Sequence, residues 1–358
     1  MSNTERNCDN QTASLYQKQN PWVSLLRIIM CFIVVCDHFE PTSNTIAENF
    51  VIQYGNIAVP CFMFLSFYFM GDDIKKNRTD KIKNRILRLY IPIFVWNIIY
   101  FGCKNIIFVV LGNPTEIIGI NSLIEGLLFT HVLGLANQLW FLFSQIIILI
   151  VIVIFLSYAK NDKYQNVMLI FLIAIALFIE YSGVNNNLFG SAAYSVRYPL
   201  GRSIECLPYA AAGLLYSWHL KDKNILIKIC LLVASTLLAV ISRVYVPTQE
   251  GFGYSDLFLL FSSTAICILT FSLPDLFKGG LRIALNYIGS CTMGIYCTHN
   301  LVGWMIQSVR SHIPLLEKTL PIDTLLFDTI VFALCLLFTT LIRCINHKLK
   351  WKWLKYTM

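Results

Sequence analysis

The chain has 358 residues, of which 56% are hydrophobic and only 13% are charged, and its mean hydropathy is +0.63. This composition excludes a water-soluble domain with an ordinary polar surface and predicts a polytopic membrane protein. The formal net charge of +8 does not indicate nucleic-acid binding, because the basic residues lie in short runs between apolar segments, where they set membrane orientation.

Residues 1–20 are polar and precede the first apolar segment. They lack the apolar core and small-residue cleavage site of a secretory signal, so we expect the first apolar segment to remain as an uncleaved anchor. We divide the chain into an N-terminal cytoplasmic tail (1–20), a membrane domain (21–345) and a C-terminal cytoplasmic tail (346–358). Basic and aromatic residues alternate in the last tail, which is typical of an interfacial anchor.

Crossing a bilayer requires roughly 20 mostly apolar residues of helix, and about ten segments satisfy this requirement. We therefore predict an all-α bundle of about ten transmembrane helices. Residues 117–131 also follow helical spacing and predict a re-entrant or interfacial helix before the fourth span. The predicted spans are residues 22–39, 51–71, 89–111, 139–159, 166–182, 204–219, 224–246, 255–273, 287–307 and 324–345.

The distribution of Lys and Arg between these spans predicts the orientation of the chain. With the N-terminus inside, twenty of the 28 basic residues lie in inner segments and six in outer segments. Basic residues are retained on the cytoplasmic side, so this bias favours an even number of spans with both termini cytoplasmic.

The first span carries Arg27 near one end and Asp37 and His38 near the other. On a helix, the eleven-residue step from Arg27 to His38 rotates the chain to within about 20° of its starting direction and rises about 16 Å. Both side chains therefore share one face, with Cys31 and Val34 between them. Each residue alone also fits an ordinary role, a snorkelling arginine or an interfacial histidine. Their shared face favours function, and a histidine suits a general base.

The twelve cysteines do not predict a metal site or a disulfide framework. Eleven lie inside or at the edges of apolar segments, and none forms a CxxC pair or a Cys/His cluster with ligand spacing. We expect them to be small buried apolar residues.

An arginine in the first span followed eleven residues later by a histidine resembles the signature of the acyltransferase 3 family. Members of this family are membrane proteins that O-acylate cell-surface carbohydrates and related acceptors. The resemblance covers almost the whole membrane region. Four further segments resemble motifs of the same family in the same order: "VPCFMFLSF" at 59–67, "KNRILRLYIP" at 83–92, "QLWFL" at 138–142 and "MGIYCTHNL" at 293–301.

Two positions depart from the family pattern. Phe67 stands where a glycine commonly follows the serine, and Gln138 stands where many members have histidine. These departures concern the shape of the pocket and the choice of acceptor, whereas the central Arg27 and His38 arrangement is retained.

The resemblance implies an enzyme that takes an acyl group from cytoplasmic acyl coenzyme A, usually acetyl coenzyme A, and delivers it to a hydroxyl that is often on the far face. On the predicted topology Arg27 lies near the inner surface, where it would help to hold the donor. His38 lies near the outer surface, where it would act as a general base or as an acyl relay. Arg85 and Arg88 are the predicted contacts for the donor phosphates. The predicted lining of the substrate pocket is Ser66, Trp140, Glu205, Tyr296 and His299.

Most of these candidates also have a simpler explanation. The two arginines of the third span equally fit the retention of positive charge inside, and Trp140 equally fits an interfacial anchor. We expect Glu205 to form an ion pair with an arginine such as Arg197 or Arg202. The tyrosine and histidine of the ninth span equally fit a hydrogen bond that ties two helices together.

A transporter or flippase of a small polar solute or a lipid-linked sugar is the alternative function, with Arg27 and His38 lining its path. An inverted repeat with interrupted helices would favour that function, and no clear internal repeat is visible in the sequence. A purely structural membrane subunit would leave the shared Arg27 and His38 face unexplained. The expected partners are an acyl coenzyme A donor, a carbohydrate or lipid-linked glycan acceptor and the lipid bilayer, with no tightly bound cofactor and no metal. The family implies a bacterial inner-membrane location.

Overall fold

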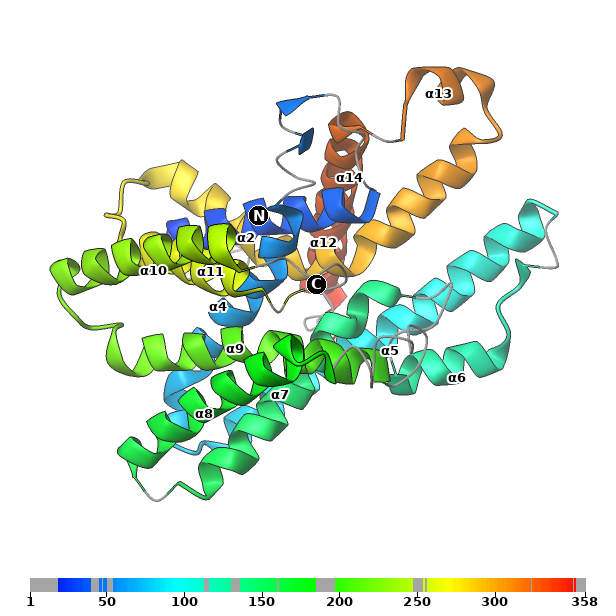
Figure 1. The fold of residues 1–358 in the computed structure, drawn as a ribbon. Helices are drawn as coiled ribbons and strands as arrows, with labels where there is room; N and C mark the ends of the chain where they lie inside the picture. The colour runs from blue at the N-terminus through cyan, green and yellow to red at the C-terminus, as the bar shows by residue number, and fades with distance from the viewer. Residues whose placement is uncertain are drawn as a thin grey trace. The chain divides into compact units, whose positions relative to one another are not determined.

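The computed structural model describes residues 19–39, 45–46, 48–49, 54–112, 116–129, 136–159, 161–184, 197–246, 254, 256–322, 324–349 and 351. Most of the two predicted tails lies outside these residues. The described ranges contain helices and no strand (Figure 1). The α-helices are α2 (Pro21–Phe39), α4 (Ala58–Lys75), α5 (Thr79–Val110), α6 (Ile120–Phe129), α7 (Trp140–Ser157), α8 (Asp162–Tyr181), α9 (Arg197–His219), α10 (Ile225–Tyr245), α11 (Leu257–Ser272), α12 (Gly279–Arg310), α13 (Pro314–Thr319) and α14 (Leu325–Leu349).

The predicted helical, multi-span character of the chain is confirmed. Seven helical segments in the described part are long and apolar enough to cross a membrane. The other three predicted spans coincide with α9, α11 and α12. None of these helices is both long enough and apolar enough to be counted with the seven. The seven segments are Pro21–Phe39, Gly55–Lys75, Thr79–Val110, Asn137–Ser157, Asp162–Tyr181, Ile225–Tyr245 and Leu325–Asn346.

Side chains placed before the first turn explain where several helices begin. Proline at the first position of α2, Pro21, has the backbone angle that a helix requires and lacks an amide that would otherwise need a partner. The Asn20 side chain accepts a hydrogen bond from the Trp22 amide at 2.9 Å. Asn161 and Asn224 accept hydrogen bonds in the same way at the starts of α8 and α10. Each asparagine satisfies an amide that the helix itself leaves without a partner.

The chain divides into two compact units. Of the described residues, those within 19–55 and 266–349 form the terminal unit, and those within 56–265 form the central unit together with residue 351. The division falls within α11, so that helix contributes to both units. The terminal unit holds α2, α12, α13 and α14, and the central unit holds α4 to α10.

In the terminal unit, α2, α12 and α14 contact one another pairwise. Between α2 and α14, the Phe32 and Phe332 rings lie 5.6 Å apart in an edge-on arrangement. Between α2 and α12, a methyl group added at Gly289 would lie 2.7 Å from the Ser24 Cβ and 2.9 Å from its Cα. Such close approach of two helix backbones requires a residue without a side chain, as is common in membrane proteins.

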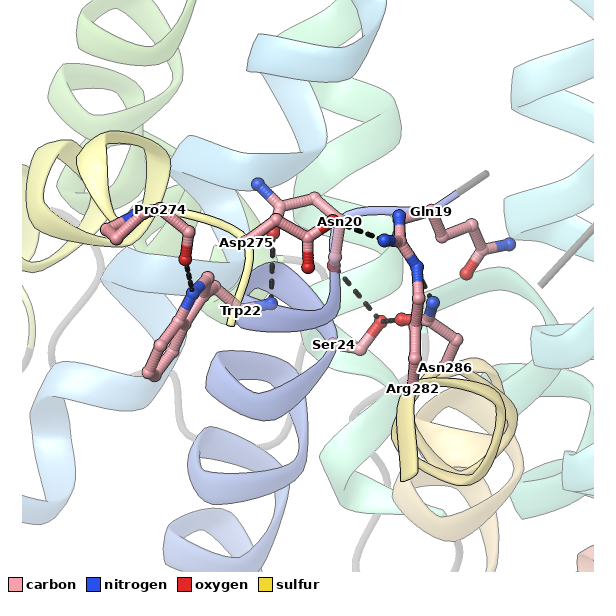
Figure 2. A network of polar contacts seen from close by, with 8 residues as sticks. All are labelled: Gln19, Asn20, Trp22, Ser24, Pro274, Asp275, Arg282 and Asn286. Atoms are coloured by element: carbon pink, nitrogen blue, oxygen red, sulfur yellow. Dashed lines mark hydrogen bonds and ion pairs between the residues drawn. The ribbon is translucent and has the colours of Figure 1, made fainter. Parts of the chain in front are cut away.

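A polar network fixes the start of α2 against the start of α12 (Figure 2). The Ser24 hydroxyl donates to the Asn286 side-chain oxygen at 2.6 Å, and the Asn286 side chain donates to the Gln19 carbonyl at 3.2 Å. Arg282 also donates to the Gln19 carbonyl, at 3.1 Å, and forms an ion pair with Asp275. Asn286 is fully buried, so these bonds satisfy polar groups that would otherwise be costly in a membrane.

In the central unit, α9 lies against α4, α7 and α8 (Figure 1). Small residues on α9 allow the closest of these contacts. A methyl group added at Gly213 would lie 2.4 Å from the Phe64 carbonyl oxygen on α4. On the same pair of helices, the Trp218 indole donates to the Gly71 carbonyl at 2.9 Å.

The helix predicted within residues 117–131 is present as α6. The prediction for the cysteines is correct for most of them: eleven are described, all are free thiols, and eight are buried. It is wrong for Cys230 and Cys344, whose side chains are exposed on α10 and α14. The outer faces of membrane helices meet lipid rather than water, so an apolar thiol is tolerated there without burial.

Candidate functional site

Helix α2 is continuous from Pro21 to Phe39, so Arg27 and His38 lie on one unbroken helix. Arg27 is half-buried and His38 is exposed. Cys31 and Val34, which lie between them on the same helical face, are buried. The helix therefore holds the two candidate groups at a fixed separation.

A second histidine lies beside His38 within the terminal unit. The rings of His38 and His299 are 4.8 Å apart between centroids and tilted by 45°. His299 belongs to α12 and is fully buried. Its Nδ1 lies 2.7 Å from the Tyr296 carbonyl oxygen and 3.3 Å from that of Ile295. The Tyr296 ring lies 5.9 Å from the His299 ring, so the structure brings three of the predicted site residues together.

In the central unit, Arg85 and Ser66 are brought together across α5 and α4. The Arg85 Nη2 donates to the Ser66 hydroxyl at 2.8 Å, and that hydroxyl donates to the Gln145 side-chain oxygen on α7 at 3.1 Å. Arg85 is half-buried, whereas Arg88, one turn further along α5, is exposed. The Ser66 hydroxyl thus holds the Arg85 guanidinium in place, whereas Arg88 lies on the surface of the helix.

The two remaining candidates, Trp140 and Glu205, meet around a third residue, Arg202. Arg202 donates to a Glu205 carboxylate oxygen at 2.6 Å, which confirms the expected ion pair. The same carboxylate oxygen accepts a hydrogen bond from the Tyr254 amide at 3.1 Å. The guanidinium lies over the rings of Tyr198, Tyr254 and Trp140, at 5.0, 5.3 and 5.9 Å from their centroids. This aromatic cluster holds Tyr254 against α9 and the start of α7.

The model of one protein family, described as an acyltransferase domain of the acyltransferase 3 type, matches residues 20–345. The chain belongs to the acyltransferase 3 family. It is therefore an acyltransferase, as the sequence motifs imply. Comparisons with curated proteins and with solved structures gave no match.

The two departures from the family pattern occupy buried positions of the acyltransferase. Phe67 is buried in α4, so the larger side chain fills the interior of the central unit. Gln138 is also buried, and its amide donates to the Tyr100 hydroxyl on α5 at 2.5 Å. A glutamine at this position serves as a polar link between two segments of the central unit.

Sequence reasoning missed Gln145 and the part played by Tyr254 in this acyltransferase. Gln145 had a visible signal, because it is a polar residue within the most apolar of the seven candidate spans, where such residues commonly have a specific partner. Tyr254 had none, because it lies in a connecting segment and acts through its backbone amide and its ring.

Among the described residues of the acyltransferase, no group of three or more His, Cys, Asp and Glu side chains is arranged to hold a metal ion. The chemistry available at the His38 end of α2 is that of imidazole, which accepts a proton from a hydroxyl or carries an acyl group. The chemistry available at Arg85 and Arg88 is that of guanidinium groups, which bind phosphates with charge-assisted hydrogen bonds.

Proposed function

We propose that this acyltransferase moves an acyl group, acetyl in the first instance, from acyl coenzyme A on the cytoplasmic side to a hydroxyl of a cell-surface carbohydrate or its lipid-linked precursor. The observation that carries the proposal is the exposed imidazole of His38, which lies beside His299 at one end of a helix whose other half carries Arg27. The family assignment favours this function over transport of a solute.

In the proposed reaction, a ring nitrogen of His38 accepts the proton of the acceptor hydroxyl. The hydroxyl oxygen then attacks the thioester carbonyl carbon, so that a carbon–oxygen bond forms and the carbon–sulfur bond breaks. Coenzyme A leaves as a thiolate and takes up the proton that His38 holds. The proton balance therefore closes within one turnover, with no further reactant.

Ten spans with both termini in the cytoplasm are part of the proposal. Ion pairs within the central unit support it, because they join segments that the topology assigns to the same inner side. Lys75, at the end of α4, pairs with Asp162 at the start of α8 at 2.7 Å, and Lys221, after α9, pairs with Asp72 on α4 at 3.4 Å. The Arg202 cluster similarly joins segments assigned to the outer side.

The donor is proposed to enter from the inner side, with its phosphates held by Arg85 and Arg88 of the central unit. The hydrogen bond from Arg85 to Ser66 supports this role, because a guanidinium that is already oriented loses less freedom when it binds a phosphate. Acyl coenzyme A is a substrate in this scheme.

The Ser66→Ala variant is expected to raise the KM for acetyl coenzyme A by about three- to tenfold with little change in kcat, since it removes one hydrogen bond that orients Arg85. The measurement is the rate of acyl transfer as a function of donor concentration. Ser157→Ala is the matched control, because the Ser157 hydroxyl bonds only within its own helix, to the Ile154 carbonyl at 2.6 Å. An unchanged KM in Ser66→Ala would contradict the role of Arg85 in donor binding.

The function itself is tested with purified protein in liposomes that is given acetyl coenzyme A labelled in its acetyl group, with and without a carbohydrate acceptor. We expect label to appear on the acceptor and free coenzyme A to form in equal amount. Label that stays on the protein when the acceptor is omitted would identify an acyl relay in place of a general base. Folded protein that neither binds the donor nor transfers label would exclude the proposed function, and movement of unmodified sugar across the membrane would establish the transporter.

A further inference from the structure

The buried ring of His299 presents a hydrogen-bond acceptor that has no partner. Its Nε2 is inaccessible to solvent, and no described residue forms a hydrogen bond with it. A buried polar atom without a partner is uncommon in a native protein, because it carries the full cost of losing water.

The contacts of the other ring nitrogen determine which form of His299 is present. Nδ1 lies 2.7 Å from the Tyr296 carbonyl, and a carbonyl oxygen only accepts hydrogen bonds. The proton of the neutral ring is therefore on Nδ1, and Nε2 carries a lone pair. The ring is held to its own helix on one side and offers a fixed acceptor on the other.

The group placed to use that acceptor is His38, whose ring centre is 4.8 Å from that of His299. Because His38 is exposed whereas His299 is fully buried, His38 is the ring with room to turn. A modest rotation of the His38 side chain would direct one of its N–H groups at the His299 Nε2. The other nitrogen of His38 would then carry a lone pair and face outward.

We infer that His299 is the positioning residue for His38: its Nε2 accepts a hydrogen bond from one ring nitrogen of His38 and thereby makes the other nitrogen the base. The inference rests on the proposed function and adds a role that the catalytic histidine cannot supply alone. When His38 takes the hydroxyl proton, both of its nitrogens carry hydrogen, and His299 continues to accept from one of them. The bond thus fixes the tautomer before the reaction and stabilises the cation formed during it.

Two matched variants, His299→Asn and His299→Gln, separate a positioning role of His299 from a merely structural one, because the two roles predict opposite effects on activity. The amide of asparagine lies near the position of Nδ1 in histidine, whereas the amide of glutamine lies near the position of Nε2. His299→Asn therefore keeps a donor for the Tyr296 carbonyl and loses the acceptor that faces His38. His299→Gln keeps an acceptor near His38 and loses the donor for the carbonyl.

The experiment measures kcat and donor KM for the full-length protein and both variants in liposomes, with acetyl coenzyme A as donor. We expect His299→Asn to lower kcat by roughly 10- to 100-fold at unchanged donor KM, and His299→Gln to retain most of the wild-type kcat. An active His299→Asn variant together with an impaired His299→Gln variant would overturn the inference. So would equal loss in both. Absence of transfer by the wild type would instead overturn the proposed function.

A spectroscopic measurement tests the pair without relying on turnover or on the variants' activity. The chain has six histidines, and ¹⁵N labelling of histidine allows the His38 signals to be assigned by their loss in His38→Ala. In the wild type we expect His38 to show one tautomer with a hydrogen-bonded N–H, and in His299→Asn a mixture of both tautomers. Identical His38 signals in the two proteins would overturn the inference.

Discussion

Replacing His38 with alanine is expected to lower the rate of acyl transfer by about 10²- to 10⁴-fold, which is the usual contribution of a positioned general base. The protein should remain folded, because the His38 side chain is exposed at the end of α2, where its ring lies beside that of His299. The measurement is the transfer of label from acetyl coenzyme A to a carbohydrate acceptor, with thermal unfolding in detergent as the check on folding.

The matched control for this variant is His312→Ala. His312 is also an exposed histidine of the terminal unit, follows the end of α12 and hydrogen-bonds locally, to the Ser308 carbonyl at 2.8 Å. The His312→Ala variant should transfer label at the wild-type rate. A fully active, folded His38→Ala protein would exclude His38 as the base and remove the main support for the proposed chemistry.

The largest effect on stability is expected from Gly213→Ala. The added methyl group would lie 2.4 Å from the Phe64 carbonyl oxygen and 3.1 Å from its carbonyl carbon, which are backbone atoms of α4 that cannot rotate away. The two helices must therefore separate along one of the main contacts of the central unit. Overpacking of this kind costs about 1–3 kcal/mol, which should appear as a lower midpoint of thermal unfolding in detergent.

Gly102→Ala provides the comparison, since Gly102 lies within α5 and a methyl group added there meets no atom within 4 Å. Alanine is also the better helix former, so this variant should be as stable as the wild type or slightly more so. If both glycine variants unfold at the same temperature, the close approach of α4 and α9 is not what limits stability.

The sequence was sufficient to locate the seven long apolar helical segments of the described part, because long apolar windows have few alternatives. It placed their starts less well. The α5 helix begins at Thr79, ten residues before the predicted span, and α12 begins at Gly279 rather than at 287. Hydropathy detects only the apolar part of a helix, whereas the backbone hydrogen bonds continue through polar and basic residues that lie outside the apolar window.

For the candidate site, spacing predicted that Arg27 and His38 share one helix, because that relation is local. Three pairs of candidate residues differ in how far the sequence could predict them. They are His38 with His299, Ser66 with Arg85, and Arg202 with Glu205. The last pair lies within one helical turn and was expected, whereas the first two depend on which helices pack together. Helix packing in lipid is decided by small residues and isolated polar groups, whose partners cannot be identified from one chain's spacing.

The polar network at the start of α2 has a consequence at the opposite end of that helix. A rigid helix that slipped by one residue at its foot would move every later side chain by about 1.5 Å and turn it by about 100°. The hydrogen bond from Ser24 to Asn286 on α12 prevents such a slip, although Ser24 precedes His38 by more than ten residues on α2. The height and direction at which α2 presents His38 to His299 therefore depend on a hydrogen bond at the far end of the helix.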